Sequence, residues 1–255
     1  MNKVKRSGSL TMRYRLRISV FLISGFMLSG CVLSLNQGWF ASKIDSAGKS
    51  PVSVAYFNPR AIPKTFAGES VIVLFHPAGT DGEEYLDGWM DEAKKGKYFF
   101  AAPTIEFDPV YWTQGYQDQL FSELERLSGK YQLVRDGAFF VGSSFGANYG
   151  FEAALAKPGK FHGGIFLNGS LGRYLDAIRR FPGRTIDAPV LLVWGSEDPN
   201  LDPEGNEKAR AIFEKAGIKN ISFEIIQGLG HAEDPFVKKE LMDLIDAKLN
   251  KMERA

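Results

Sequence analysis

A G-x-S-x-G sequence at residues 142–146 is the feature that most constrains the fold of this chain. Residues 138–141 before it are all apolar and predict a buried strand, and residues 147–156 after it predict a helix. In this context the motif is typical of a sharp strand-to-helix turn, which holds its central serine in a strained backbone conformation. The flanking glycines supply the small residues that such a turn needs. The sequence therefore predicts Ser144 as a nucleophile, with Ser143 at a variable position beside it.

A serine is a weak nucleophile until a histidine takes its proton and a carboxylate orients that histidine. The chain has three histidines, and His231 lies in a glycine-rich loop after a strand-like run at 221–226. Asp198 follows a second strand-like run at 189–194. The order Ser144, Asp198, His231, each on a loop after a separate predicted strand, favours nucleophilic catalysis by a serine.

Two of these assignments have alternatives. The neighbouring Glu197 could be the orienting acid, or Asp198 could form a turn before Pro199. His162 is a weaker rival to His231, because it precedes an apolar strand and is expected at the opposite edge of the sheet, on the surface.

With these motifs the chain resembles small serine esterases or lipases of the α/β-hydrolase superfamily over most of its length after residue 30. The resemblance also rests on His76-Pro77-Ala78-Gly79 after the strand-like run 71–75, and on the sequence around Asp198 and His231. It implies an α/β-hydrolase fold with a mostly parallel central sheet flanked by helices. Strands are expected near 52–57, 71–75, 98–102, 138–142, 164–168, 189–194 and 221–226, and helices at 115–127, 147–156, 204–215 and 234–249.

The resemblance implies that backbone N–H groups of Ala78 and Phe145 form an oxyanion hole. Pro77 replaces the usual glycine and has no N–H group, so Gly79 is an alternative first donor. His76 is expected either to brace this turn through hydrogen bonds or to contact the substrate.

The substrate site is expected to be open, because about twenty residues between Asn168 and Pro189 leave no room for a large helical cap. Predicted substrate contacts are His76, Gly79 and Trp112. Aromatic residues could form an apolar wall or belong to the core; they are Phe107, Tyr111, Trp112 and Phe145, with Tyr85 and Trp89 predicted at the rim.

Residues 1–30 predict a bacterial export signal, because six basic and no acidic residues accompany an apolar run at 18–28. The run ends in Leu28-Ser29-Gly30-Cys31, which resembles a bacterial lipobox and predicts lipid attachment at Cys31, the only cysteine. A buried cysteine and an uncleaved membrane anchor are the alternatives. The predicted organisation is a signal peptide at 1–30, a lipid-anchored linker at 31–50 and a hydrolase domain at 51–255, in the bacterial cell envelope.

Without residues 1–30 the chain has 25 basic and 30 acidic residues, a net charge of −5, which argues against a nucleic-acid partner. The sequence has no H-E-x-x-H motif, and neither a metal nor an organic cofactor is predicted. The expected partners are a small or polymer-attached ester and a lipid membrane, and the protein is expected to be a monomer. The alternative functions are those of an acyltransferase or thioesterase that uses the same three residues, or of a non-catalytic, lipid-anchored binding protein.

Overall fold

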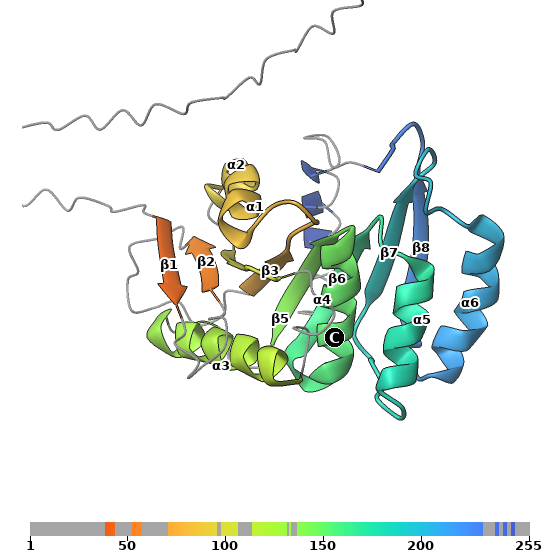
Figure 1. Cartoon of the computed structure of the whole chain (residues 1–255), viewed down its shortest axis with the longest axis horizontal. Coiled ribbons are helices and arrows are strands. Elements are labelled where there is room, and N and C mark those ends of the chain that lie inside the picture. The colour runs from red at the N-terminus through yellow and green to blue at the C-terminus, as the bar shows by residue number, and fades with distance from the viewer. Residues whose placement is uncertain are drawn as a thin grey trace, which may run out of the picture. The chain divides into compact units, whose positions relative to one another are not determined.

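An eight-stranded sheet forms the centre of the computed structural model, in the order β1-β2-β4-β3-β5-β6-β7-β8 (Figure 1). The structure describes residues 39–43, 53–57, 71–95, 98–106, 114–131, 133, 137–231, 238–239, 242–243 and 246–247. The strands are β1 Trp39–Lys43, β2 Ser53–Phe57, β3 Val71–Phe75, β4 Phe99–Pro103, β5 Ala138–Ser143, β6 Phe161–Leu167, β7 Val190–Gly195 and β8 Ile221–Ile226. The pairs from β4 to β8 are parallel, whereas β1 and β2 add an antiparallel edge.

Helices cover both faces of this sheet. They are α1 Gly82–Gly88, α2 Met90–Ala93, α3 Gln114–Tyr131, α4 Phe145–Ala156, α5 Leu171–Arg180 and α6 Pro203–Lys215, with a short 3₁₀ helix at Pro158–Lys160. One core cluster includes residues of α3 to α6, and the other includes residues of α1, α2 and the C-terminal Met242. Because β3, β4, β5 and β7 are buried along their whole length, their sequences are almost continuously apolar.

The helix α4 packs closely on the centre of the sheet. A Cβ atom at Gly150 would lie 2.8 Å from the Phe166 ring and 2.9 Å from the Phe75 ring. Phe151 of the same helix contacts the rings of Phe166 and Tyr174 edge to face, at centroid separations of 5.9 and 4.9 Å. This packing fixes the N-terminal end of α4 at the carboxyl end of β5.

The predicted fold class is confirmed, and strands β2 to β8 occur where the apolar runs predict them. The predicted linker at 31–50 is wrong for residues 39–43, because β1 pairs with β2 and so extends the sheet. Trp39 and Phe40 favour a strand, but their neighbours do not. Of the predicted helix 234–249, the described residues 238–239, 242–243 and 246–247 are helical.

The connection between β6 and β7 contains only α5, so no large cap is inserted there. Among the described residues, no helix is both long and apolar enough to span a bilayer. The predicted signal peptide at 1–30 and the predicted lipid attachment site Cys31 lie outside the described residues.

Candidate active site

Ser144 occupies the turn between β5 and α4 in a backbone conformation that non-glycine residues rarely adopt, with φ 53° and ψ −118°. Its N–H group donates a hydrogen bond of 2.8 Å to the carbonyl of Leu167, at the end of the neighbouring strand β6. Such strained residues cluster at functional sites, where the surrounding structure maintains them. The turn therefore presents the Ser144 side chain at the carboxyl edge of the sheet.

The two glycines of the motif are required by close backbone approach. A Cβ atom at Gly146 would lie 2.0 Å from the Phe75 carbonyl oxygen and 2.5 Å from that of His76. A Cβ atom at Gly142 would lie 2.5 Å from the Gly146 carbonyl oxygen. The prediction that both positions need small residues is confirmed, and the start of α4 lies directly against the end of β3.

A continuous chain of hydrogen bonds joins Ser144, His231 and Asp198. The Ser144 Oγ atom lies 2.9 Å from His231 Nε2. On the other side of the ring, His231 Nδ1 lies 3.1 and 3.0 Å from the two carboxylate oxygens of Asp198. A proton on Nδ1 can be donated to Asp198, which leaves Nε2 as the acceptor for the Ser144 hydroxyl. The structure thus brings together the three residues that the sequence singles out.

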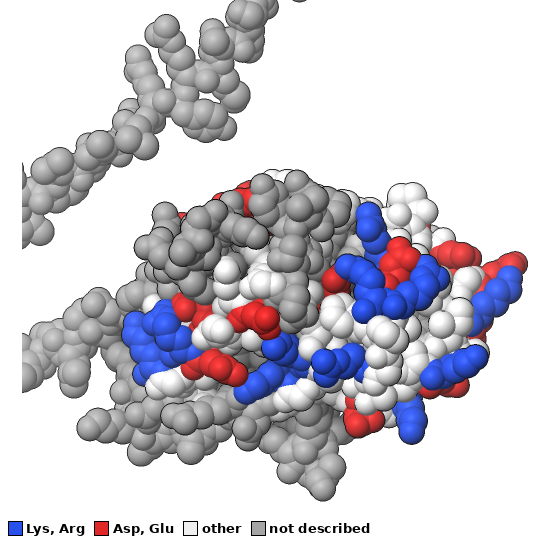
Figure 2. All heavy atoms as spheres, turned by 60° about the horizontal axis from the view of Figure 1, so that its bottom comes forward, with Lys and Arg blue, Asp and Glu red and all other residues white. Residues whose placement is uncertain are grey.

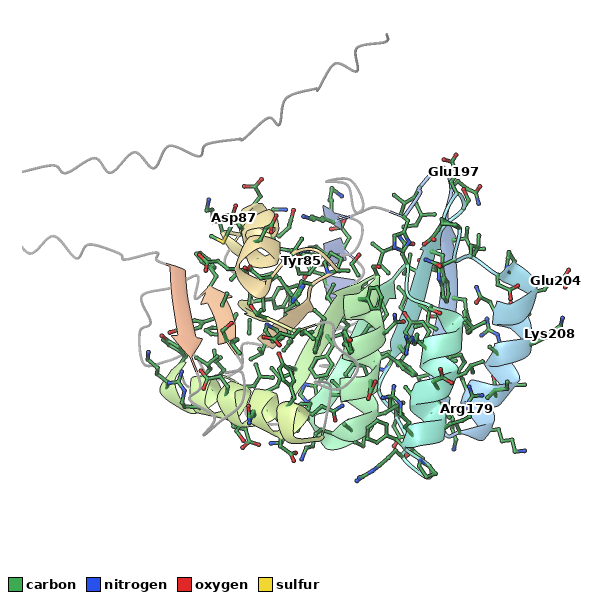
Figure 3. All side chains as sticks on the ribbon, in the orientation of Figure 1. Tyr85, Asp87, Arg179, Glu197, Glu204 and Lys208 are labelled. Carbon is green, nitrogen blue, oxygen red and sulfur yellow. The ribbon has the colours of Figure 1, made fainter. Side chains whose placement is uncertain are left out.

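Asp198, and not Glu197, supplies the carboxylate that contacts His231. The Asp198 side chain is fully buried, and its Oδ1 accepts a 2.7 Å hydrogen bond from the Asn200 N–H group. Glu197 is exposed at the outer tip of the loop after β7 (Figure 3). The side-chain amide of Asn200 also lies 3.2 Å from His231 Nδ1.

Backbone contacts hold the loop after β7 against the loop that carries His231. The Glu197 N–H group donates to the Leu229 carbonyl at 2.9 Å, and the Gly228 N–H group donates to Ser196 Oγ at 2.9 Å. A Cβ atom at Gly195 would lie 2.0 Å from the Leu229 carbonyl oxygen. Asp198 and His231 therefore sit on two loops that form one packed unit.

The proposed oxyanion donors come from two adjacent segments. Ala78 and Gly79 form an exposed turn after β3, with Gly79 at φ 87°, and Phe145 is the first residue of α4. The first turn of a helix presents N–H groups that have no partner within the helix. The contact between Gly146 and the end of β3 brings these segments together, while their roles as donors stay predictions.

His76 lies beneath the turn after β3 and braces it through hydrogen bonds. Its ring is fully buried; Nδ1 lies 2.9 Å from the Pro77 carbonyl, to which it can donate, and Nε2 accepts a 2.9 Å bond from the Ile105 N–H group. Burial lowers the pKa of this imidazole, which favours the neutral form that these two bonds require. These contacts support the predicted bracing role of His76, and its contact with substrate stays a prediction.

Two aromatic residues predicted at the rim belong to the core. Trp89 is fully buried and Tyr85 is 7% exposed, and both pack beneath α1 on the sheet, where the Trp89 ring contacts Phe100. The prediction is wrong because their spacing of four along one helix face directs them toward the sheet. The other wall candidates Phe107, Tyr111 and Trp112 lie outside the described residues, whereas the Phe145 side chain is 42% exposed beside Ser144.

His162 lies at the second residue of β6, at the end of that strand opposite Leu167. It is half-buried, and Gly137 approaches its ring so closely that a Cβ atom there would lie 2.6 Å away. Its predicted position, away from Ser144, is confirmed, but it is less exposed than expected.

One residue near the site, Asn168, is not among those that the sequence motifs predict; it is buried, with φ 54°, just beyond β6. Its side chain bonds to backbone groups of both loops that carry Asp198 and His231. The local signal was the dipeptide Asn168-Gly169 directly after an apolar strand, because asparagine tolerates the left-handed conformation.

Within the part of the chain that the structure describes, no group of three or more histidine, cysteine, aspartate or glutamate side chains could hold a metal ion.

No family model matches the sequence, and no curated protein matches it. Solved structures do match. The chain superposes on a hyperthermophilic esterase from the archaeon Pyrobaculum calidifontis with a TM-score of 0.60 at 16% identity, covering 86% of this chain and 87% of that one. A protein of unknown function from Agrobacterium tumefaciens, described as an α/β hydrolase, gives 0.61 at 15% identity, covering 83% and 97%.

A third match is a protein from Bacteroides ovatus assigned as a dipeptidyl aminopeptidase IV, with a TM-score of 0.63 at 14% identity. The match covers 84% of this chain but only 36% of that much longer one. At these identities the matches show the fold alone.

Proposed function

We propose that this α/β-hydrolase-fold chain is a serine hydrolase that cleaves carboxylic esters through an acyl-enzyme on Ser144. The observation that carries the proposal is the hydrogen-bond chain from Ser144 Oγ through His231 to Asp198, with steps of 2.9 and 3.0 Å. Nucleophile, base and orienting acid are all within the reach that proton transfer requires.

In the proposed mechanism His231 takes the Ser144 proton through Nε2 while Oγ attacks the ester carbonyl. The buried Asp198 carboxylate stabilises the imidazolium that forms, because it accepts a hydrogen bond from Nδ1. The alkoxide leaving group then takes the proton from Nε2 and departs, which leaves the acyl group on Ser144. Water, deprotonated by His231, releases the acid and restores the serine.

The negative charge on the tetrahedral intermediate needs N–H donors, and we assign them to Phe145 and to Ala78 or Gly79. The strained turn at Ser144 supports this assignment, since it places the nucleophile directly before the first N–H group of α4. Pro77 cannot contribute, and its carbonyl is already bonded by the Thr80 hydroxyl at 3.2 Å.

Small or polymer-attached esters are the proposed substrates, because α5 alone fills the connection where a large cap could cover the site. Acyl transfer to an acceptor other than water, and thioester hydrolysis, use the same three residues. An added alcohol or amine that increases release of the leaving group without increasing release of the free acid would favour the transferase alternative.

We further propose that Cys31 carries a lipid that anchors the mature chain in the bacterial cell envelope. The proposal rests on the basic and apolar signal sequence that ends at this single cysteine. Incorporation of a radiolabelled fatty acid by cells that produce the chain, and its loss in Cys31→Ala, is the expected result. Equal labelling of the variant would contradict it.

The central test is hydrolysis of p-nitrophenyl esters of graded acyl length by the full chain. Ser144→Ala should reduce kcat/KM at least about 1,000-fold, because it removes the nucleophile. Ser143→Ala is the matched control, because this serine is adjacent but buried in β5, and it should retain activity to within about threefold. If wild type and Ser144→Ala hydrolyse all esters equally while both are folded, the esterase proposal fails.

A further inference from the structure

We propose that Asn168 is a positioning residue that fixes the distance between Ser144 and His231. Its role is to join the strand end that holds the nucleophile turn to the two loops that carry Asp198 and His231. This inference rests on the proposed function for its effect on catalysis, but its structural core can be measured without any activity.

The backbone of Asn168, like that of Ser144, has a positive φ angle. Among the described residues, these two are the only non-glycine residues with positive φ, 54° for Asn168 and 53° for Ser144. Asn168 is 2% exposed, and its N–H group donates to the Val193 carbonyl of β7 at 2.7 Å. The left-handed conformation turns the chain out of β6 and directs the buried side chain toward the neighbouring loops.

The oxygen and the nitrogen of the Asn168 side-chain amide bond to two different loops. Its Oδ1 accepts from the Gly195 N–H group at 3.0 Å, at the start of the turn that leads to Asp198. Its Nδ2 donates to the Gly230 carbonyl at 3.2 Å, on the residue directly before His231. Only a primary amide of this length offers an acceptor and a donor at one position, so neither aspartate nor leucine could make both bonds.

The residues on either side of Asn168 complete the connection. Leu167 accepts the 2.8 Å hydrogen bond from the Ser144 N–H group, and the Gly169 carbonyl accepts a 2.8 Å bond from the Trp194 indole. Three consecutive residues at the end of β6 thus bond to the nucleophile turn, to β7 and to the histidine loop. Loss of the Asn168 side chain would keep the hydrogen bond between Leu167 and Ser144 but remove the one to Gly230, next to His231.

The variants separate these bonds. Asn168→Gly retains easy access to positive φ but deletes both side-chain bonds. Asn168→Asp can still accept from Gly195 but places an acceptor opposite the Gly230 carbonyl, so it loses the bond next to His231. We expect kcat to fall about 10- to 100-fold in both variants, with KM changed less than about threefold, because a misplaced base affects the chemical step.

Leu124→Ala is the control for stability loss alone. Leu124 is buried near Ala138, where β5 begins, far along the strand from Ser144, so this variant should unfold more easily but keep kcat within about twofold. If Asn168→Gly loses no more kcat than this control at equal fractions folded, the positioning role is overturned.

A second readout is independent of turnover. The chain has three histidines, so histidine labelled with ¹⁵N gives a simple NMR spectrum in which the Nδ1 proton of His231, bonded to Asp198, can be assigned. We expect the signal of this proton to be protected from exchange with water in wild type and in Leu124→Ala. In both Asn168 variants we expect the signal to disappear through exchange. Persistence in the Asn168 variants would refute the inference even if no ester is hydrolysed, whereas an inert wild type with the expected NMR pattern would refute only the proposed function.

Discussion

Of two adjacent carboxylates, Asp198 and Glu197, only Asp198 contacts His231. Both follow β7 in a short loop, but only Asp198 turns inward, where Asn200 donates to its Oδ1 at 2.7 Å and His231 contacts both oxygens. Glu197 is exposed and uses its backbone N–H group to hold the histidine loop. A carboxylate orients an imidazole only if it is directed at Nδ1 and shielded from water.

Asp198→Asn should therefore reduce kcat about 10³- to 10⁴-fold, because an amide nitrogen facing Nδ1 favours the tautomer in which Nε2 cannot accept the serine proton. Glu197→Gln, its neighbour-matched control, should change kcat less than about twofold. Steady-state kinetics on an activated ester measures both. Equal losses in the two variants would contradict the assignment of Asp198.

At the scale of elements, the strand β5, the turn at Ser144 and the helix α4 form one unit whose geometry depends on glycine. Gly146 allows the backbone of α4 to approach that of β3 more closely than any side chain permits. Gly129 in α3 is different, because a Cβ atom there would meet nothing within 4 Å and the residue lies in an ordinary helix.

Gly146→Ala should destabilise the fold by more than about 3 kcal/mol, since a Cβ atom 2.0 Å from a carbonyl oxygen forces α4 away from β3. Gly129→Ala should stabilise it by about 0.5–1 kcal/mol, because alanine is the better helix former. Urea denaturation measures both changes. A tolerated Gly146→Ala would show that α4 can shift and that the close approach is not needed.

At the scale of the whole molecule, most described charge pairs are at the surface, where basic and acidic side chains are interspersed on the face shown in Figure 2. Lys160 with Glu125 and Arg179 with Asp176 are examples of exposed pairs, which contribute little to stability. Glu152 is one of the few buried members of such pairs, because its carboxylate is buried in α4 while both of its oxygens accept hydrogen bonds from Arg180 of α5. Burial outweighs this pairing and raises the pKa of Glu152 from 4.5 to about 7.

A carboxyl group whose pKa is higher in the folded state binds a proton more tightly when folded. Its contribution to stability is therefore complete below pH 4.5 and is lost as the pH rises toward about 7. Glu152→Gln should accordingly gain stability relative to wild type over this range, on the order of 1–3 kcal/mol. Denaturation of both proteins from pH 4 to 8 measures the difference, with the exposed Glu125→Gln as control. A relative loss instead would show that the Arg180 pair outweighs burial.

The sequence alone determined the features that depend on neighbours in the chain. Apolar runs predicted β2 to β8, and the spacing of two glycines around Ser144 predicted the turn, because a strand-to-helix turn without side chains at these positions is a local steric requirement. The sequence also predicted that Asp198 and His231 lie on loops, because both residues come shortly after apolar, strand-like runs.

The tertiary structure alone decided which side chains meet. It turned Asp198 rather than Glu197 toward His231, buried Tyr85 and Trp89 in the core, and fixed His76 between two strand ends. It also paired β1 with β2 and placed Asn168 between loops that lie 27 and 62 residues further along the chain. The physical reason is that periodicity and turn chemistry report only local conformation, whereas these contacts depend on how β6, β7 and β8 align at the carboxyl edge of the sheet.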